Sequence, residues 1–144
     1  MIVYRYSVTF NAPIDFVYNW CTDYREDDPQ ITGASYRRII LEKNKKRVIY
    51  ASDKKSSDGS TKLAVRIVTL SPGDYSWHLD YFSEEDLEQG DYKLNRIGKE
   101  KTRLDMVFRN RWKDGPGPTK EQFVSETKSS WDAYVPALEK DYSG

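Results

Sequence analysis

The chain has 144 residues, equal numbers of acidic and basic side chains and a net charge of zero. Its length suits a single domain over residues 1–144, and the balanced charge argues against a dedicated nucleic-acid or membrane-surface protein, because both classes usually carry a basic excess. The 4 Trp, 11 Tyr and 5 Phe residues bury large areas, while Tyr and Trp keep a polar tip. We therefore expect a core built largely on aromatic rings.

No apolar run approaches the roughly 18 residues of a membrane span. Arg5 lies where a secretory signal would need an uninterrupted apolar region. The single cysteine, Cys21, excludes an intramolecular disulfide and fits a reducing compartment. The sequence thus predicts a cytoplasmic protein with no integral membrane association.

The N-terminal segment changes its hydrophobic period at Asn11-Ala12-Pro13. Before this point, large apolar residues recur with the period of two that is typical of a strand with one buried face: Ile2, Tyr4, Tyr6, Val8 and Phe10. After it, helical spacing separates Ile14, Val17, Tyr18 and Cys21. Pro13 fits a first-turn position, where its missing N–H costs nothing. The pattern predicts a strand followed by a short amphipathic helix.

A connection over residues 23–33 has room for one further helical turn. Strands are then expected at about 34–42, 46–53, 61–71, 74–82, 88–97 and 101–112, between turns rich in Gly, Pro, Asn and Ser. Alternation predicts a core-facing set: Leu63, Val65, Ile67, Tyr75, Trp77, Leu79, Tyr81, Tyr92, Leu94, Leu104, Met106, Phe108 and Trp112. The opposite parity carries polar residues that include Lys62, Arg66, His78, Asp80, Arg103, Arg109 and Arg111. This is the pattern of an antiparallel meander with one solvated face.

A long helix is predicted at the end of the chain. Thr119 and Gln122 form a capping box after Gly115-Pro116-Gly117-Pro118. One helical stripe then holds Phe123, Thr127, Ser130, Trp131, Tyr134, Ala137 and Leu138. We expect this stripe to lie across the concave face of the sheet. Since Pro136 removes a backbone donor, the well-formed part of the helix is placed at about 119–135, with bent or frayed turns beyond.

This order of elements is the α+β helix-grip arrangement. Residues 6–23, YSVTFNAPIDFVYNWCTD, resemble the opening strand and Ala-Pro helix start of the START-like (SRPBCC) superfamily. That superfamily includes the polyketide cyclase/dehydrase-like branch and the birch-pollen-allergen-like proteins. The resemblance implies an antiparallel sheet of about seven strands curved around a long C-terminal helix, with a hydrophobic molecule bound between them. Its motif is structural and assigns no catalytic residue.

The chain offers few groups for other chemistry. His78 is the only histidine, so no His-based metal cluster is expected, and its parity places it on the outer face with Asp80 as a solvent-side partner. Cys21 on the apolar helix stripe fits a small buried hydrophobe better than a nucleophile. Gly115-Pro116-Gly117-Pro118 lacks the lysine and hydroxyl of a P-loop. We expect neither a metal nor a cofactor, and catalytic residues stay unassigned.

Candidate ligand-binding residues are those that face the space between sheet and helix. The apolar candidates are Trp77, Tyr81, Tyr92, Leu94, Met106, Phe108, Trp131 and Tyr134. Polar candidates to orient a ligand are Arg96, Asn110, Thr127 and Ser130. The alternatives are that Arg96 and Asn110, near strand ends, reach water, and that Thr127 and Ser130 bond back to helix carbonyls.

The leading function is binding of a hydrophobic small molecule, aromatic or polycyclic, and a homodimer is left open as a further partner. One alternative is a polyketide cyclase or dehydratase in which a buried Tyr, Asn or Arg polarises a carbonyl. The other is a protein-interaction module resembling chaperone regulators, which uses the outer surface. A filled interior would favour the interaction module, an apolar cavity the binding protein, and a cavity with a perturbed acid or base the enzyme.

Overall fold

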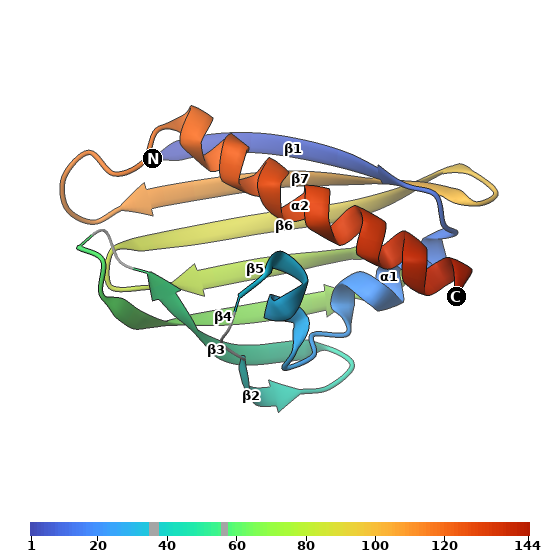
Figure 1. Cartoon of the computed structure of the whole chain (residues 1–144), viewed down its shortest axis with the longest axis horizontal. Helices are drawn as coiled ribbons and strands as arrows, with labels where there is room; N and C mark the ends of the chain where they lie inside the picture. Colours follow the sequence, from blue (N-terminus) through green and yellow to red (C-terminus); the bar gives the residue numbers. More distant parts are fainter. Residues whose placement is uncertain (35–37, 56–57) are drawn as a thin grey trace.

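The structure is a computed structural model that describes residues 1–34, 38–55 and 58–144. Its elements, in chain order, are β1 (Ile2–Phe10), α1 (Ile14–Thr22), η1 (Asp28–Thr32), β2 (Ile39–Lys43), β3 (Arg47–Lys55), β4 (Thr61–Ser71), η2 (Pro72–Asp74), β5 (Ser76–Phe82), β6 (Asp86–Gly98), β7 (Lys101–Trp112) and α2 (Lys120–Ser143). A 7-stranded antiparallel sheet has the order β1-β7-β6-β5-β4-β3-β2. Figure 1 shows α2 lying across one face of this sheet, with α1 near its C-terminal end. The α+β helix-grip prediction is confirmed.

The first strand, β1, forms one edge of the sheet and pairs with the last strand, β7. β1 runs antiparallel to β7, from the pair Ile2 and Asn110 to the pair Phe10 and Thr102. Tyr4 and Phe10 are buried, as the alternation predicted. This pairing brings the N-terminal strand under α2, where its inward side chains meet the helix.

The predicted strands lie close to the observed ones. The strand expected at about 34–42 begins at Ile39, and residues 35–37 and 56–57, which include part of one expected turn, lie outside the described residues. The connection after α1 holds the further helical turn that was expected, at Asp28–Thr32. Pro13 is the N-cap of α1, with φ −70° and ψ 154°, so it stands one residue before the first turn.

The predicted inward face of β4 is wrong. Ala64 and Val68 are buried, whereas Leu63 is 61% exposed. Val68 is paired with the buried Leu79 of β5, and Arg66 with the buried Tyr81. Arg66 therefore faces inward, and the residues expected to face the core, Leu63, Val65 and Ile67, face outward. Their outward face is itself apolar, because Val65 lies between Ala51 of β3 and Phe82 of β5.

The helix α2 continues past Pro136 to Ser143, beyond the end that was predicted. Leu138 is fully buried in the core. The indole of Trp20 donates a hydrogen bond of 2.8 Å to Asp141, and the hydroxyl of Tyr142 donates one of 2.6 Å to Glu100. These contacts hold the last turns in helical form despite the donor that Pro136 lacks.

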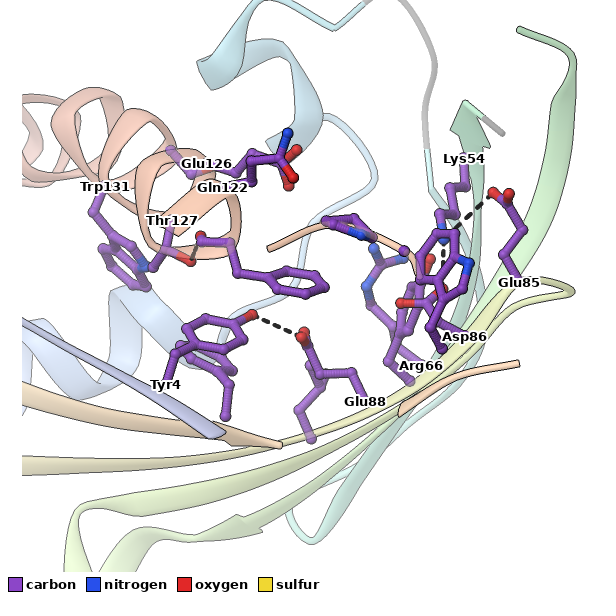
Figure 2. Close-up of a pocket in the computed structure, with 18 of the residues that line it drawn as sticks. Tyr4, Lys54, Arg66, Glu85, Asp86, Glu88, Gln122, Glu126, Thr127 and Trp131 are labelled. Carbon is purple, nitrogen blue, oxygen red and sulfur yellow. Dashed lines mark hydrogen bonds and ion pairs between the residues drawn. The ribbon is translucent and has the colours of Figure 1, made fainter. Parts of the chain in front are cut away.

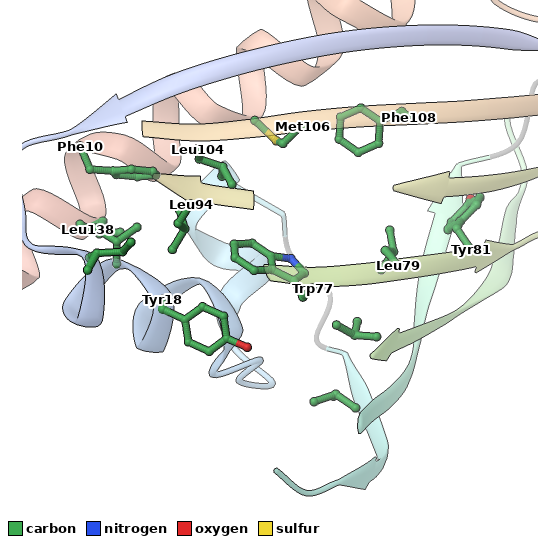
Figure 3. Packing of buried hydrophobic residues seen from close by; sticks show 14 of the residues in the cluster. Phe10, Tyr18, Trp77, Leu79, Tyr81, Leu94, Leu104, Met106, Phe108 and Leu138 are labelled. Atoms are coloured by element: carbon green, nitrogen blue, oxygen red, sulfur yellow. The ribbon is translucent and has the colours of Figure 1, made fainter. Parts of the chain in front are cut away.

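Side-chain packing is tightest at the end of the sheet near α1. Phe10, Leu104 and Leu138 are fully buried there, next to Leu94 and Tyr18 (Figure 3). Toward the other end, the inward side chains are mostly aromatic and leave space beneath the first half of α2. None of the described helices is both long and apolar enough to cross a membrane.

If Leu138 anchors α2 beyond Pro136, Leu138→Ala should lower the free energy of unfolding by about 2–5 kcal/mol, the range for truncating a buried leucine. Chemical denaturation measures this change, and Lys128→Ala on the exposed face of the helix serves as control. A loss below about 1 kcal/mol would place the last turns of α2 away from the core.

Candidate functional site

A cavity of about 1100 Å³ lies between the first half of α2 and the inner face of the sheet (Figure 2). Its walls come from β1, β3 to β7, α2 and the loop that precedes α2. Aromatic rings and charged groups both face it. They include Tyr4, Lys54, Arg66, Leu79, Tyr81, Asp86, Glu88, Tyr92, Phe108, Trp112, Phe123, Thr127, Ser130, Trp131 and Tyr134. The cavity is thus amphipathic, and it is larger than a single side chain could fill.

Stacked rings form the floor beneath the helix. The ring of Tyr4 stacks between Phe108, at a centroid distance of 4.9 Å, and Phe123 of α2, at 5.1 Å. Tyr92 meets Phe108 edge to face at 5.6 Å. Such contacts stabilise the rings beyond simple burial and restrict their orientations. The floor is therefore a rigid apolar surface.

A carboxyl and a phenol meet in the cavity wall. The hydroxyl of Tyr4 donates a hydrogen bond of 2.7 Å to Oε1 of Glu88 (Figure 2). Nδ2 of Asn110 donates one of 3.2 Å to the same oxygen. Burial raises the pKa of Glu88, although these hydrogen bonds favour its ionised form. Burial and the neighbouring Glu88 also raise the pKa of Tyr4. Glu88 therefore keeps its proton to a higher pH than an ordinary glutamate.

Two cations occupy the other end of the cavity. Lys54 contacts Asp86 in an ion pair and donates a hydrogen bond of 3.2 Å to Ser83. Its ammonium lies 5.2 Å from the ring centroid of Trp112. The guanidinium of Arg66 donates a hydrogen bond of 2.6 Å to Ser52 and lies 4.6 Å from the ring centroid of Tyr81. Aromatic faces and oxygen acceptors thus stabilise both charges at the cavity wall.

A second, smaller chamber of about 160 Å³ adjoins the main cavity. The two share walls formed by Arg66, Leu79, Tyr92, Trp131 and Tyr134. The remaining walls of this side chamber come from α1, η1, the strands β3 and β5 and the connections that follow α1 and precede β2. They include Cys21, Tyr24, Ile31, Arg38, Tyr50 and Trp77. Among the described residues, no group of three or more His, Cys, Asp or Glu side chains is placed to hold a metal ion.

No protein-family model matches the chain, and no curated protein matches it. Solved structures do. The Zhui aromatase/cyclase from Streptomyces sp. R1128 superposes with a TM-score of 0.74 at 14% identity, over 99% of this chain and 93% of that one. A START superfamily protein from Mycobacterium smegmatis gives 0.74 at 15% identity, over 96% and 97%. The chain has the START-like (SRPBCC) helix-grip fold. Ara h 8.0201 has this fold too, with a TM-score of 0.68, 18% identity and coverage of 98% and 97%.

Most of the candidate residues face a cavity of this START-like fold. The main cavity is lined by Tyr81, Tyr92, Phe108, Thr127, Ser130, Trp131 and Tyr134. Trp77 faces the side chamber instead. The hydroxyl of Thr127 donates a hydrogen bond of 2.9 Å to the carbonyl of Phe123, as the alternative interpretation had it, and still lines the cavity.

Four candidates line neither cavity. Leu94 and Met106 are buried in the core. Arg96 is exposed near the end of β6, as its alternative interpretation proposed. Asn110 is buried and does not reach water. Its Nδ2 donates a hydrogen bond of 2.9 Å to Asp86 and also contacts Glu88, so it positions two carboxylates of the wall.

Sequence reasoning missed the charged residues of the site. Glu88 shares the parity of Tyr92 and Leu94 in β6, so its inward orientation could have been found from the alternation. Arg66 could not, because β4 carries apolar residues on both parities. His78 lies on the outer face as predicted, with Nε2 3.1 Å from Asp80, and its Nδ1 also lies 2.7 Å from Asp91, a partner that was not foreseen.

The opposite pKa shifts of two neighbouring carboxyls predict opposite effects of pH. Because the pKa of Glu88 is raised in the folded state, its stabilising contribution is present at low pH and is lost as pH rises through that value. Glu88→Gln should therefore stabilise the protein at neutral pH relative to wild type. This advantage should vanish on acidification below about 4.3, the ordinary pKa of Glu. Denaturant unfolding at a series of pH values measures it.

Asp86 provides the matched control. Burial alone would raise its pKa, but hydrogen bonds from Lys54, Ser83 and Asn110 lower it overall. Its contribution is therefore present at neutral pH and is lost as pH falls, so Asp86→Asn should destabilise at neutral pH and much less in acid. The same pH dependence for both variants would contradict the difference between the two carboxyls.

Proposed function

We propose that the chain binds a hydrophobic small molecule, aromatic or polycyclic, in the main cavity between the sheet and α2. The observation that carries this proposal is the unfilled volume of about 1100 Å³ above a floor of stacked aromatic rings. Volumes of roughly 300–1,000 Å³ with mostly apolar walls and a few polar groups are typical of small-molecule sites. At about 1100 Å³ this cavity slightly exceeds that range, which suits a ligand of several rings.

Charged side chains at one end of the cavity would orient the ligand. Lys54, Arg66 and Glu88 lie on strands at the end of the cavity opposite to Trp131 (Figure 2). A hydroxyl or carbonyl group of the ligand can exchange hydrogen bonds with these side chains while its apolar body lies on the rings of Tyr4, Phe108 and Phe123. The solved structures with this fold include an aromatase/cyclase and a START superfamily protein, which supports a ligand-binding role over a purely structural one.

A matched pair of serines on α2 tests this function. Ser130 lines the main cavity, whereas the adjacent Ser129 is exposed. A hydrophobic fluorophore should bind the wild-type protein at about one equivalent. Ser130→Trp should abolish this binding by placing an indole in the part of the cavity where the dye would lie, at an overpacking cost of up to about 1–3 kcal/mol. Ser129→Trp should leave it unchanged.

Thr127→Trp is the second filling variant, from the preceding turn of the helix. Fluorescence titration gives the stoichiometry, and a cooperative denaturation curve confirms that each variant is folded. Non-saturable uptake of the dye, or saturable binding that survives in both filling variants, would place the hydrophobic site elsewhere on the molecule.

The Glu88–Tyr4 pair favours a second function, that of a cyclase or dehydratase. A carboxyl whose pKa is raised by burial is, once ionised, a stronger general base than an ordinary glutamate. Glu88 would take a proton from the carbon between two carbonyls. The resulting enolate forms a carbon–carbon bond with a third carbonyl further along the chain, whose oxygen develops negative charge that Arg66 can stabilise. That oxygen is then protonated, and its loss with a neighbouring proton as water needs no oxidant.

A linear triketone serves as the probe of this second function. The enzyme should convert it to a cyclic product that has lost one water, as followed by mass spectrometry. Glu88→Gln should abolish turnover and retain fluorophore binding. Equal turnover with the wild-type protein and in a protein-free control would leave the chain as a binding protein only.

A further inference from the structure

Seven of the thirteen side chains that line the side chamber of about 160 Å³ are aromatic, and the others include Asp28, Arg38 and Arg66. On one side, Trp77 and Tyr92 stack at a centroid distance of 4.9 Å with an interplanar angle of 11°. On another, the rings of Tyr24 and Tyr50 lie 5.5 Å apart. These rings come from β3, β5, β6 and the segment after α1, so four separate parts of the chain converge on one small space.

Arg38, which also lines the chamber, contacts the rings of both Tyr24 and Tyr50. The guanidinium of Arg38 lies 4.6 Å from the ring centroid of Tyr50 and 5.4 Å from that of Tyr24. Arg38 is held in turn by an ion pair of 2.9 Å with Asp28 of η1. Cation–π contacts of a partly buried arginine are stronger than those at the open surface. The wall is thus held in place in the absence of a ligand.

The backbone at Tyr24 is in an unfavourable conformation. Its φ of 41° lies in the left-handed region, which bulky residues other than glycine rarely adopt and which costs free energy. Glycine would relieve this strain but would remove the ring from the chamber. Strain of this kind persists where the surrounding structure requires the side chain, and it is most frequent at binding and active sites.

The volume of the chamber sets the size of its occupant. A protein cavity of about 150 Å³ with apolar walls binds benzene. A chamber of about 160 Å³ therefore matches one six-membered ring and is too small for two fused rings. Because Arg66, Leu79 and Tyr92 line both spaces, the chamber and the main cavity adjoin at these side chains.

We propose that the side chamber holds a single aromatic ring at one end of the ligand, whose larger and more polar part lies in the main cavity. This inference rests on the proposed binding function. It narrows the ligand to molecules that end in a monocyclic aromatic ring joined to the rest by a rotatable bond. Planar rings are favoured over saturated ones because they can offer edges and faces to the four surrounding rings.

Phenol and cyclohexanol are the matched probes, since they share one ring size and one hydroxyl and differ in aromaticity. The indole N–H signal of Trp77 in NMR spectra reports occupancy of the chamber. Phenol should shift this signal saturably at one equivalent and bind about tenfold more tightly than cyclohexanol, the difference expected from edge-to-face contacts. Equal affinities, or no saturable shift with phenol, would overturn the proposal.

Cys21 lines the side chamber and not the main cavity, and it is the single cysteine of the chain. Cys21→Phe should fill the chamber and reduce phenol binding at least tenfold, whereas Cys21→Ala should retain it. Ile31→Phe fills the chamber from η1 and replaces Cys21→Phe should that variant fail to fold. Phenol binding unchanged in a folded filling variant would also overturn the proposal.

The hydrophobic fluorophore separates this proposal from the function on which it rests. In the Cys21→Phe protein it should still bind, because the main cavity is unaltered. If the wild-type protein binds the fluorophore but not phenol, the proposal for the side chamber is wrong and the proposed binding function stands. If the wild-type protein does not bind the fluorophore, the main cavity is not a ligand site, whether or not phenol binds.

Discussion

The cavity exists because α2 is held against the sheet at two separated points. Phe123 near its start and Leu138 near its end are the buried residues of this helix. Phe123 stacks on Tyr4 of β1, and Leu138 enters the core beside Phe10 and α1. Between these two anchors the helix presents the small side chains of Thr127 and Ser130 to the sheet. Neither can reach the opposite wall, so the space between them stays unfilled.

The buried polar groups at the wall of the cavity have partners before any ligand binds. Lys54 pairs with Asp86, Asn110 bridges Asp86 and Glu88, and Tyr4 donates to Glu88. A ligand can therefore enter without leaving a buried charge uncompensated, which would otherwise oppose binding strongly. The unusual pKa of Glu88 follows from the same burial that shapes the apolar floor. Binding and catalysis would thus draw on one set of side chains.

The two cavities divide ligand recognition by size and polarity. The main cavity combines charged groups with stacked rings and has room for several rings. The side chamber is small and partly aromatic, and the guanidinium of Arg38 contacts the rings of Tyr24 and Tyr50 in its wall. Arg66 and Tyr92 stand where the two meet. These shared residues would contact both parts of a ligand at once.

Much of this fold could be predicted from the sequence, because the spacing of apolar residues identifies most elements as strand or helix. β1 and β5 alternate strictly, and the capping box of Thr119 and Gln122 marks the start of α2. β4 could not be oriented, since Leu63 and Ala64 begin two apolar parities, and a charged Arg66 is normally a sign of exposure. Its inward position follows from pairing with Tyr81, a long-range contact that single-strand patterns do not contain.

The end of α2 and the side chamber could not be predicted from the sequence, because both depend on contacts between distant parts of the chain. Leu138 and Asp141 keep the helix intact beyond Pro136 through contacts with α1 and the core, which local propensity does not express. The chamber depends on how Tyr24, Tyr50 and Trp77 converge from three elements. Volume is a property of that convergence, so the sequence predicted aromatic walls without revealing the size of the space.

Mass spectrometry of small molecules released from the purified native protein tests the central claim most directly. The account predicts an organic molecule that co-purifies in near-stoichiometric amount with the wild-type protein and with Ser129→Trp, and that is absent from Ser130→Trp. The same molecules at the same level in all three proteins, or none in any of them, would contradict a ligand-binding cavity beneath α2.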